Sequence, residues 1–356
     1  MPSSPSTLYR ALRPLLFRLD AERAHRLALA AVRGLSAAPP LLRFTGSAGA
    51  PDARLAQQLL GRGVPSPLGL AAGLDKDAVG IPFWFACGFG FVEVGTVTRR
   101  PQAGNPRPRL FRHPGLESLQ NALGFNNAGL EALRRRLRDH PFERPVLVNL
   151  GKGRDTPLER AADDYLALVE GLEDRCDAFV VNLSSPNTPG LRELERSGAV
   201  GRLTGQLVRA TRRPLLVKLS PDQPTADAVA AAREVLAAGA SGIVLTNTTT
   251  DYSLIPGARS VGGLSGRVLA ERSYALLRAV AAEVPPSTLL VSVGGVDSAA
   301  EVWRRLAAGA RLVELYTALV YHGPSLIRRL EEDLLRRMER EGVEHLDQLV
   351  GRDLGR

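Results

Sequence analysis

The chain has 356 residues, 44% of them hydrophobic and 23% charged, and a formal net charge of +9. This balance is typical of a globular protein with a sizeable core and excludes a disordered or fibrous chain. Because the arginines are scattered beside acids and only 5% of residues are aromatic, the positive charge does not indicate a nucleic-acid partner.

Residues 1–45 predict two short amphipathic helices that carry seven arginines against two acids. Apolar residues recur at helical spacing at Leu8, Leu12, Leu15, Leu16 and Leu19, and after Asp20 at Ala24, Leu27, Ala28, Ala31 and Leu35. The segment lacks the basic start of a secretory signal, and no part of the chain approaches a membrane-spanning run. The pattern favours a surface that lies on an anionic membrane; the alternative is a helix pair that packs on the following domain.

From Leu68 onward, short apolar runs alternate with helical patterns. Eight runs predict strands, at 68–72, 91–96, 146–150, 178–183, 215–219, 242–246, 289–293 and 311–316, and helices are expected at 158–173, 224–238, 267–283 and 298–308. Near-continuous apolar strands separated by helices indicate a parallel sheet covered on its faces, and eight repeats favour a (β/α)8 barrel. A doubly wound sheet is the alternative, but no GxGxxG follows the first strand.

The expected organisation is an extension at 1–45, a catalytic barrel at 46–340 and a tail at 341–356. Two long segments, 97–145 and 247–266, follow strands and are rich in turn-forming residues. Long connections in a compact domain are usually functional. Because barrel active sites form at the carboxyl ends of the strands, both segments are expected to shape the site.

Polar groups gather at the predicted carboxyl ends of the strands. Gly294 and Gly295, with Gly266, predict a phosphate site, since glycine lets backbone N–H groups approach an anion. Four asparagines near these ends suit a flat ligand with alternating carbonyl and N–H groups, namely Asn121, Asn182, Asn187 and Asn247.

Only three of the 46 basic residues are lysines, namely Lys76, Lys152 and Lys218, and each follows a short apolar run. In so arginine-rich a chain, a lysine indicates a position where a guanidinium is too broad and planar or cannot give up its proton. Cys87 and Cys176 are far apart and predict buried free thiols. Without a cysteine cluster, and with five dispersed histidines, no metal or iron–sulfur site is expected.

The chain resembles the quinone-dependent class of dihydroorotate dehydrogenases from about residue 8 to about residue 330. The motifs that carry the resemblance are GLAAGLDKD, GTVTRRPQ, GNPRPRLFR, NALGFNN, NLSSPNTPGLR, NTTT, GGLSGR and SVGGVDS. It implies oxidation of (S)-dihydroorotate to orotate in pyrimidine synthesis, with FMN as cofactor and a membrane quinone as final electron acceptor. It also implies an enzyme held peripherally at the cytoplasmic face of the cell membrane, monomeric and without an obligate protein partner.

The resemblance assigns roles to individual residues. Flavin contacts are expected at Ala72, Gly73, Leu74, Asp75, Lys76, Thr96, Asn149, Asn182, Lys218, Thr246, Gly266, Gly295, Tyr316 and Thr317. Substrate contacts are expected at Lys76, Asn121, Ala122, Leu123, Gly124, Phe125, Asn182, Asn187, Asn247 and Thr248. Ser185 falls at the position of the catalytic base, where soluble relatives have cysteine. Ala122 and Thr317 depart from the pattern of a close relative, which has arginine and serine there.

These roles predict a mechanism. Serine is a poor base at neutral pH, so Ser185 needs a proton acceptor, a water relay or close coupling to hydride loss. Lys218 is expected to stabilise charge on the reduced flavin, and Lys76 to hold substrate and flavin together. Arg109 is expected to border a tunnel through which the N-terminal helices admit quinone.

Three other functions are compatible with parts of the pattern. A Schiff-base aldolase would explain the lysines but not the asparagines or the N-terminal extension. A 2-hydroxy-acid oxidase would have a histidine base at a strand end, and the sequence has none there. A non-catalytic phosphate-binding barrel is the third alternative.

Overall fold

The computed structural model describes residues 5–42 and 51–355. Eight parallel strands form a closed barrel in the order β10-β12-β13-β3-β4-β7-β8-β9. These strands are β3 (Leu68–Leu70), β4 (Phe91–Val97), β7 (Val146–Leu150), β8 (Ala178–Asn182), β9 (Leu215–Leu219), β10 (Gly242–Leu245), β12 (Leu289–Val293) and β13 (Leu312–Leu315). Each lies within or next to one of the eight predicted runs, so the expected (β/α)8 barrel is confirmed.

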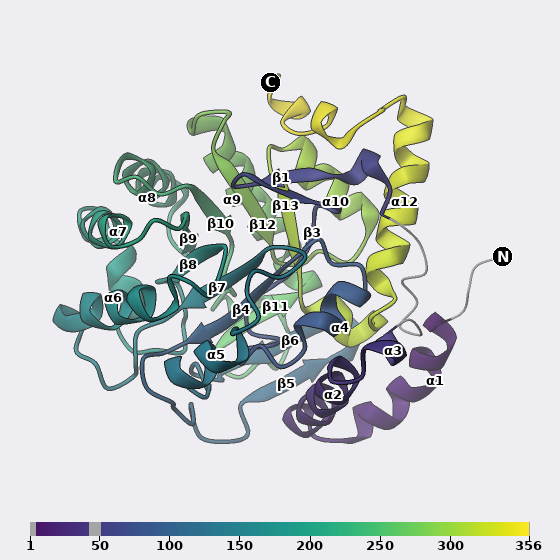
Figure 1. Cartoon of the computed structure of the whole chain (residues 1–356), viewed down its shortest axis with the longest axis horizontal. Helices are drawn as coiled ribbons and strands as arrows, with labels where there is room; N and C mark the ends of the chain where they lie inside the picture. Colours follow the sequence, from purple (N-terminus) through teal and green to yellow (C-terminus); the bar gives the residue numbers. More distant parts are fainter. Residues whose placement is uncertain (1–4, 43–50, 356) are drawn as a thin grey trace.

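Helices surround the barrel (Figure 1). They are α4 (Ile81–Ala86), α5 (Leu130–Arg136), α6 (Ala161–Leu172), α7 (Ala199–Ala210), α8 (Thr225–Ala237), α9 (Ala270–Glu283), α10 (Ala299–Ala307), α11 (Thr317–His322) and α12 (Leu326–Glu341). Single 3-10 turns occur at η2 (Ala53–Leu55), η3 (Pro114–Leu116), η4 (Leu158–Arg160), η5 (Leu191–Glu195), η6 (Tyr252–Leu254), η7 (Arg267–Leu269), η8 (Leu346–Gln348) and η9 (Arg352–Leu354). The four helices predicted within the barrel correspond to η4–α6, α8, η7–α9 and α10.

Alternation along the strands divides the core into two layers. On β7, Val146 and Val148 face the helices, whereas Leu147 belongs to a separate cluster inside the barrel. Strands that are buried on both faces read as continuous apolar runs, which is why the sequence pattern located them. Cys87 and Cys176 are buried free thiols, as predicted.

The amino-terminal end of the barrel is closed by a hairpin that the sequence did not predict. β1 (Gln57–Leu59) pairs with β2 (Arg62–Val64), and both Leu59 and Val64 join the cluster inside the barrel. Beyond α12, the C-terminal residues pack on the domain through the fully buried Leu346 and Leu349. The barrel is therefore plugged at this end, and only its carboxyl end offers a mouth.

Three short strands form an antiparallel sheet in the order β11-β6-β5. β5 (Leu110–His113) and β6 (Ser118–Asn121) come from segment 97–145, and β11 (Gly263–Gly266) comes from segment 247–266. Both segments were expected as loops, because four-residue strands that pair with distant parts of the chain leave no local pattern. The sheet carries Asn121 and Gly266 to one place.

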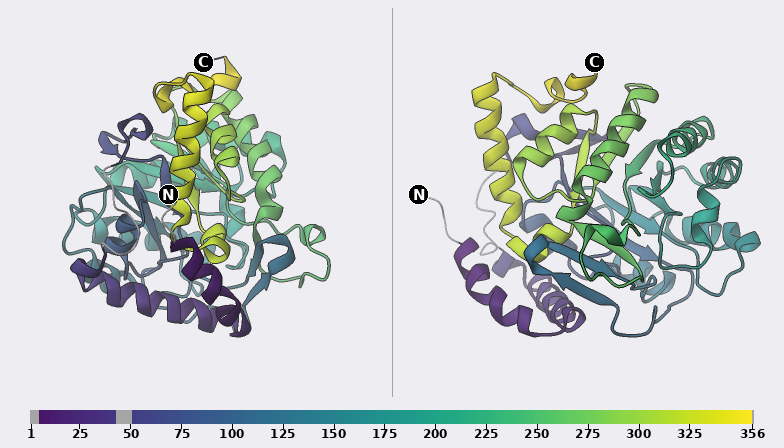
Figure 2. Two further views of the ribbon diagram at one scale, coloured as in Figure 1. Left: turned by 90° about the vertical axis from the view of Figure 1, so that its right-hand side faces the viewer. Right: turned by 180° about the vertical axis from the view of Figure 1, so that it is seen from behind.

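The N-terminal helices α1 (Pro5–Arg18) and α2 (Ala21–Ser36), followed by α3 (Pro39–Leu42), lie on the outside of the barrel (Figures 1 and 2). The side chain of Asp20 caps α2, accepting from the backbone N–H groups of Glu22 and Arg23 at 3.1 and 3.0 Å. α2 contacts α4 and β5. The expected boundary between residues 45 and 46 lies outside the described residues.

Candidate active site

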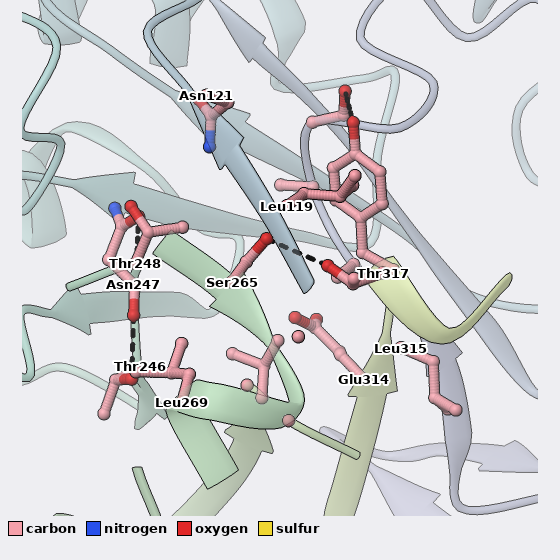
Figure 3. A pocket seen from close by; sticks show the side chains of 18 of the residues that line it. Leu119, Asn121, Thr246, Asn247, Thr248, Ser265, Leu269, Glu314, Leu315 and Thr317 are labelled. Atoms are coloured by element: carbon pink, nitrogen blue, oxygen red, sulfur yellow. Dashed lines mark hydrogen bonds between the residues drawn. The ribbon is translucent and has the colours of Figure 1, made fainter. Parts of the chain in front are cut away.

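A pocket opens at the carboxyl ends of the barrel strands, beneath the β11-β6-β5 sheet (Figure 3). Its empty space is about 1160 Å³, including the part open to solvent. Nineteen of the residues predicted for the site line it, namely Ala72, Gly73, Lys76, Thr96, Asn121, Leu123, Gly124, Phe125, Asn182, Ser185, Asn187, Lys218, Thr246, Asn247, Thr248, Gly266, Gly295, Tyr316 and Thr317. Residues spread over most of the chain thus converge on one mouth.

Four predicted contacts lie outside the lining of this pocket. Asp75 accepts hydrogen bonds from the backbone N–H groups of Val79 and Gly80, both at 2.8 Å, and from Trp84 Nε1 at 3.0 Å. Both of its side-chain oxygens therefore hold the loop before α4, and the expected cofactor contact of Asp75 stays a prediction. Leu74 is buried and lines a neighbouring cavity instead.

Asn149 and Ala122 lie just behind the lining. Asn149 Nδ2 donates to Glu93 Oε1 at 2.5 Å, and its Oδ1 accepts from Thr96 at 2.5 Å. Ala122 offers its carbonyl to Asn105 Nδ2 at 3.0 Å, so its small side chain is not needed for the contact. Both residues support the wall of the pocket and do not form it.

Glycines shape one side of the pocket into a cradle. Gly294 and Gly295 have φ values of +112° and +77°, and a Cβ on Gly295 would lie 2.5 Å from the backbone N of Ala270. Only glycine allows this close approach of the loop after β12 to the first turn of α9. Loop backbone beside a helix N-terminus is the expected setting for a phosphate. Across the cradle, the hydroxyls of Ser265 and Thr317 are 2.9 Å apart (Figure 3).

Arg305 supports this cradle from behind and is fully buried. Its Nη2 donates to the carbonyls of Gly294 at 2.8 Å and Ala270 at 3.1 Å, and to Ser273 Oγ at 3.0 Å. Burial lowers the pKa of the guanidinium to about 10, so the group stays charged at neutral pH. Arg305 therefore joins β12 to α9 and adds positive charge behind the predicted phosphate site.

Asparagines connect the strand ends through hydrogen bonds. Asn182 Nδ2 donates to Asn149 Oδ1 at 3.2 Å, and Asn247 Nδ2 donates to Asn182 Oδ1 at 3.1 Å and Ser184 Oγ at 2.9 Å. Asn247 Oδ1 accepts from the backbone N–H of Thr248 at 2.7 Å. A linked set of amides holds its donors and acceptors at set positions, as recognition of a flat polar ligand requires.

Ser185 lies at the pocket wall and is 4% exposed. Its Oγ accepts a hydrogen bond from the backbone N–H of Asn187 at 3.2 Å. Asn187 Nδ2 in turn donates to Asn121 Oδ1 at 3.1 Å, which joins the β8–α7 loop to β6. An N–H donated to the serine oxygen favours its deprotonated form and so assists a base.

Arg192 holds the loop that carries Ser185. Its guanidinium donates to Ser184 O at 3.0 Å, Asp222 Oδ2 at 2.8 Å and Thr248 O at 3.1 Å. One side chain therefore joins the segments that follow β8, β9 and β10. The sequence analysis did not predict this contact.

Lys218 projects into the pocket from β9 and pairs with two buried carboxylates. Its Nζ is 3.4 Å from Glu93 Oε2 and 3.7 Å from Glu314 Oε2. Burial opposes its charge, but the two carboxylates outweigh burial and raise the pKa of the ammonium. Lys218 is thus a fixed cation, whereas a Schiff-base lysine must be neutral to attack.

The other two lysines differ in setting. Lys76 is half-buried, and removal from water lowers its pKa to about 8. Lys152 lies outside the pocket, where its Nζ donates to Gly153 O at 2.8 Å and Thr156 O at 2.5 Å. Lys152 therefore holds the β7–α6 loop, which supplies the role that the sequence left open.

Three further residues belong to the site although the sequence analysis missed them. Ser265 and Glu314 line the pocket, and Glu93 contacts Lys218 from the interior. Glu93 in FVEVGT and Glu314 in RLVELY are lone acids inside otherwise apolar runs. That interruption was a usable signal, because an unpaired charge is rarely buried.

A second cavity lies between α2 and the barrel. It is lined by residues of α2, of the β3–α4 loop and of segment 97–145, including His25, Leu29, Arg109 and Leu123. Arg109 is buried and pairs with Glu22 of α2 at 2.9 Å. Lys76 and Leu123 line both cavities, so the two spaces share a wall.

Within residues 5–42 and 51–355, no group of three histidine, cysteine, aspartate or glutamate side chains could hold a metal ion. The fold and the pocket define a (β/α)8-barrel protein with a ligand site at the barrel mouth. A family model described as "Dihydroorotate dehydrogenase" matches residues 54–338. The chain belongs to this flavin-dependent family, and its relatives place it in the quinone-dependent class.

The relatives match nearly the whole chain. "Dihydroorotate dehydrogenase (quinone)" of Sulfurovum sp. is 44% identical over 351 residues, covering 98% of this chain and 99% of the relative. The proteins of the same description from Deinococcus radiodurans and Thermus thermophilus are 46% and 48% identical, covering 97% and 94% of this chain and 100% and 98% of their own lengths. The crystal structure of DHODH from Eimeria tenella in complex with ferulenol superposes with a TM-score of 0.81 at 30% identity, covering 94% of this chain and 96% of that one.

Proposed function

We propose that this protein oxidises (S)-dihydroorotate to orotate in pyrimidine biosynthesis, with FMN as first electron acceptor and a membrane quinone as second. The observation that carries the proposal is the convergence of Ser185, the linked asparagines, Lys76 and Lys218 on one pocket beside a glycine cradle. Family membership supplies the reaction, and the convergence of these residues supports a role for them in it.

The pocket residues fit FMN. The cradle of Gly266, Gly294 and Gly295 with Thr317 would hold its phosphate, and Lys218 would meet the edge of the ring that gains charge on reduction. Bound FMN supplies a two-electron acceptor for the hydride that leaves C6 of the substrate. Lys218 and the glycine cradle keep this acceptor in place.

Substrate binding and proton removal fall to residues on the other side of the pocket. Asn121, Asn187 and Asn247 would orient the pyrimidine ring, and the cationic form of Lys76 would hold its carboxylate. Ser185 would then take the C5 proton while its own hydroxyl proton passes to a water relay, with the Asn187 N–H stabilising the negative charge that develops on Oγ. Proton removal is coupled to hydride loss, because serine alone is a weak base.

Quinone would enter through the second cavity. The cavity reaches Lys76 and Leu123 at the wall of the first pocket, so an acceptor there lies next to the flavin site. Burial first, and the charge of Lys76 second, lower the pKa of His25 to about 4, so this wall residue is neutral at pH 7. The expected border position of Arg109 agrees with its place in this cavity.

The N-terminal helices would rest on the membrane. Leu12, Leu15, Leu19 and Leu27 are 44%, 58%, 38% and 56% exposed, and Leu41 is 48% exposed. Exposed arginines accompany these leucines on α1 and α2. Apolar side chains flanked by cations suit an anionic bilayer surface, and no described helix is long and apolar enough to cross one. We place the enzyme peripherally at the cytoplasmic face of the cell membrane.

The resemblance to the family also implies a monomer without an obligate protein partner, which stays a prediction. Aldolase chemistry is disfavoured, because Lys218 is held charged by its contacts with Glu93 and Glu314 and Lys152 is engaged with carbonyl groups.

The test is an absorption spectrum of the purified full chain before and after anaerobic addition of dihydroorotate. We expect bound FMN that loses its visible absorption with dihydroorotate and regains it with a quinone. A colourless protein that borohydride traps on a carbonyl substrate would overturn the proposal in favour of an aldolase. A yellow protein that dihydroorotate does not bleach would assign another substrate.

A further inference from the structure

Three buried ionisable side chains meet inside the barrel just below the pocket. Glu93 from β4, Lys218 from β9 and Glu314 from β13 are each at most 5% exposed. Lys218 Nζ lies within 3.7 Å of a carboxylate oxygen of both glutamates. We call these residues the Glu–Lys–Glu triad.

The strand between the two glutamates presents small residues to the barrel interior. β3 lies between β4 and β13, and its inward-facing positions are Gly69 and Ala71. A Cβ on Gly69 would lie 2.1 Å from the ring of Phe91, so this position admits no side chain. The Phe91 ring therefore fills the space beside Gly69, and the strands on either side of β3 carry Glu93 and Glu314 toward the same lysine.

The charges of the triad do not balance if both carboxylates are ionised. One ammonium would then face two carboxylates in a dry interior, leaving a net negative charge whose burial costs several kcal/mol. A single proton shared between the carboxylates removes this cost and makes the triad neutral. Two buried acids that contact each other commonly share a proton in this way.

The contacts indicate which glutamate holds the proton. Glu93 is closer to Lys218 and also accepts from Asn149 Nδ2 at 2.5 Å, so its charge is compensated. Neither oxygen of Glu314 has a hydrogen-bond partner among the described residues, although one lies 3.7 Å from Lys218. Burial and the charge of Glu93 both raise the pKa of Glu314 well above its ordinary value.

Glu314 also faces the ligand. Its side chain projects from β13 into the pocket, below Ser265 and Thr317 (Figure 3). Lys218 lines the same pocket, whereas Glu93 lies behind it. Glu314 is thus a buried carboxyl group of the triad that points into the ligand site, where its charge can act on what binds.

We propose that Glu93 and Glu314 together carry one negative charge against Lys218, and that this neutral triad sets the reduction potential of the bound flavin. The inference rests on the proposed function, because it requires FMN beside Lys218. Charge near the flavin ring tunes its potential, and reduction adds negative charge to the ring. A triad with net negative charge would oppose reduction by dihydroorotate, whereas a neutral triad leaves Lys218 able to stabilise the reduced ring.

The experiment measures the flavin reduction potential of purified holoenzymes by spectroelectrochemistry at neutral pH. Glu314→Gln replaces a neutral carboxyl group by a neutral amide, so we expect the wild-type potential. In Glu93→Gln, Glu314 gives up its proton and restores the single negative charge, so the potential again stays near wild type. The double variant leaves Lys218 uncompensated, and its potential rises well beyond the sum of the two single changes.

Glu331→Gln is the matched control, since Glu331 is a largely buried glutamate on α12 away from the pocket, and its change should leave every potential unaltered. A raised potential in Glu314→Gln alone would show that Glu314 is ionised and would overturn the proposal. A double variant with the wild-type potential would show that the triad does not act on the flavin.

Infrared spectroscopy gives a second measurement that does not depend on turnover. The wild type should show a protonated-carboxyl C=O band that shifts in D₂O and is absent from both Glu314→Gln and Glu93→Gln. If the double variant fails to fold, this band and the reduction potential of Glu314→Gln still test whether Glu314 is protonated. A wild-type protein without bound flavin would instead refute the proposed function, while the infrared band would still test the shared proton.

Discussion

At the scale of single residues, the site depends on groups whose ordinary chemistry is altered by their neighbours. Ser185 receives an N–H from Asn187, Lys218 faces two carboxylates, and Lys76 loses part of its affinity for a proton. Each change follows from one or two contacts and from partial or complete removal from water. Two predictions belong at this scale.

Ser185→Ala removes the proposed base without disturbing the pocket. We expect bound FMN and substrate affinity to be retained, and flavin reduction by dihydroorotate to slow by about 10²- to 10⁴-fold, the usual contribution of a general base. Stopped-flow absorbance measures the rate. Ser184→Ala is the matched control, because its hydroxyl contacts Asn247 and lies outside the pocket lining, so its effect should be much smaller. A near-normal rate of flavin reduction in Ser185→Ala would show that Ser185 is not the base.

Lys76 predicts the pH dependence of product binding. Its ammonium is present below its pKa of about 8 and is lost above it, so the anion orotate should bind well at pH 7 and progressively more weakly above pH 8. The dissociation constant of orotate, followed through the flavin spectrum, should rise up to about ten-fold per pH unit there. Lys76→Gln should bind orotate weakly at every pH. A wild-type dissociation constant that stays flat from pH 7 to 9.5 would contradict this assignment.

At the scale of elements, two parts of the fold serve the site without reacting. Arg305 of α10 joins β12 to α9 behind the phosphate cradle, and α2 lines the second cavity while α1 and α2 expose leucines to solvent. The first arrangement makes the cradle rigid, and the second connects the pocket to the proposed membrane surface.

Arg305→Lys should weaken FMN binding by about ten-fold or more, because a lysine cannot serve three acceptors in the plane of a guanidinium, and each lost charge-assisted bond is worth about 1.5–3 kcal/mol. Fluorescence titration of apoprotein with FMN measures the affinity. Arg304→Lys is the neighbouring control, since Arg304 pairs with Glu271 and Glu301 on the surface of α9 and α10. An unchanged FMN affinity in a stably folded Arg305→Lys protein would exclude this supporting role.

Leu15→Glu with Leu27→Glu should abolish binding to anionic vesicles and reduce turnover with long-chain quinones several-fold, because two charges replace two apolar side chains on the proposed membrane face. Reduction of the flavin by dihydroorotate should stay normal. Vesicle co-sedimentation and parallel assays with short- and long-chain quinones measure both effects. Val261→Glu alters another exposed apolar residue, 43% exposed and away from these helices, and should change neither. Full vesicle binding by the double variant would show that the membrane-binding surface lies elsewhere on the molecule.

At the scale of the whole molecule, the pocket joins distant parts of the chain. Its lining runs from Ala71 after β3 to His322 at the end of α11, and the antiparallel sheet brings two long insertions over the same mouth. A ligand held there contacts elements from most of the barrel, so its binding is linked to the stability of the entire domain.

Removal of FMN should therefore lower the melting temperature. A ligand present at 100 times its dissociation constant stabilises the native state by about 2.7 kcal/mol, which predicts a rise of several degrees on reconstitution. Differential scanning calorimetry of apoprotein with and without FMN measures the shift. Riboflavin, which lacks the phosphate, should give a much smaller rise because it leaves the glycine cradle empty. Equal shifts in melting temperature with FMN and riboflavin would show that the phosphate does not bind in that cradle.

The sequence alone predicted the barrel, most of the pocket lining and both N-terminal helices. These features follow from local patterns: apolar strands buried on both faces, helical spacing around Asp20, and polar residues at strand ends. The part of Asp75 in holding the loop before α4 could not be predicted in this way, because it depends on contacts with Val79, Gly80 and Trp84.

Tertiary structure alone decided which distant residues meet. The pairing of β6 with β5 and β11, the clamp of Arg192, the buried Arg305 and the meeting of Glu93 and Glu314 at Lys218 all join positions far apart in the chain. Such contacts leave no periodic trace, because barrel closure and strand register determine them. The two lone glutamates were visible as interruptions in apolar strands, but only the closed barrel shows that they share one lysine.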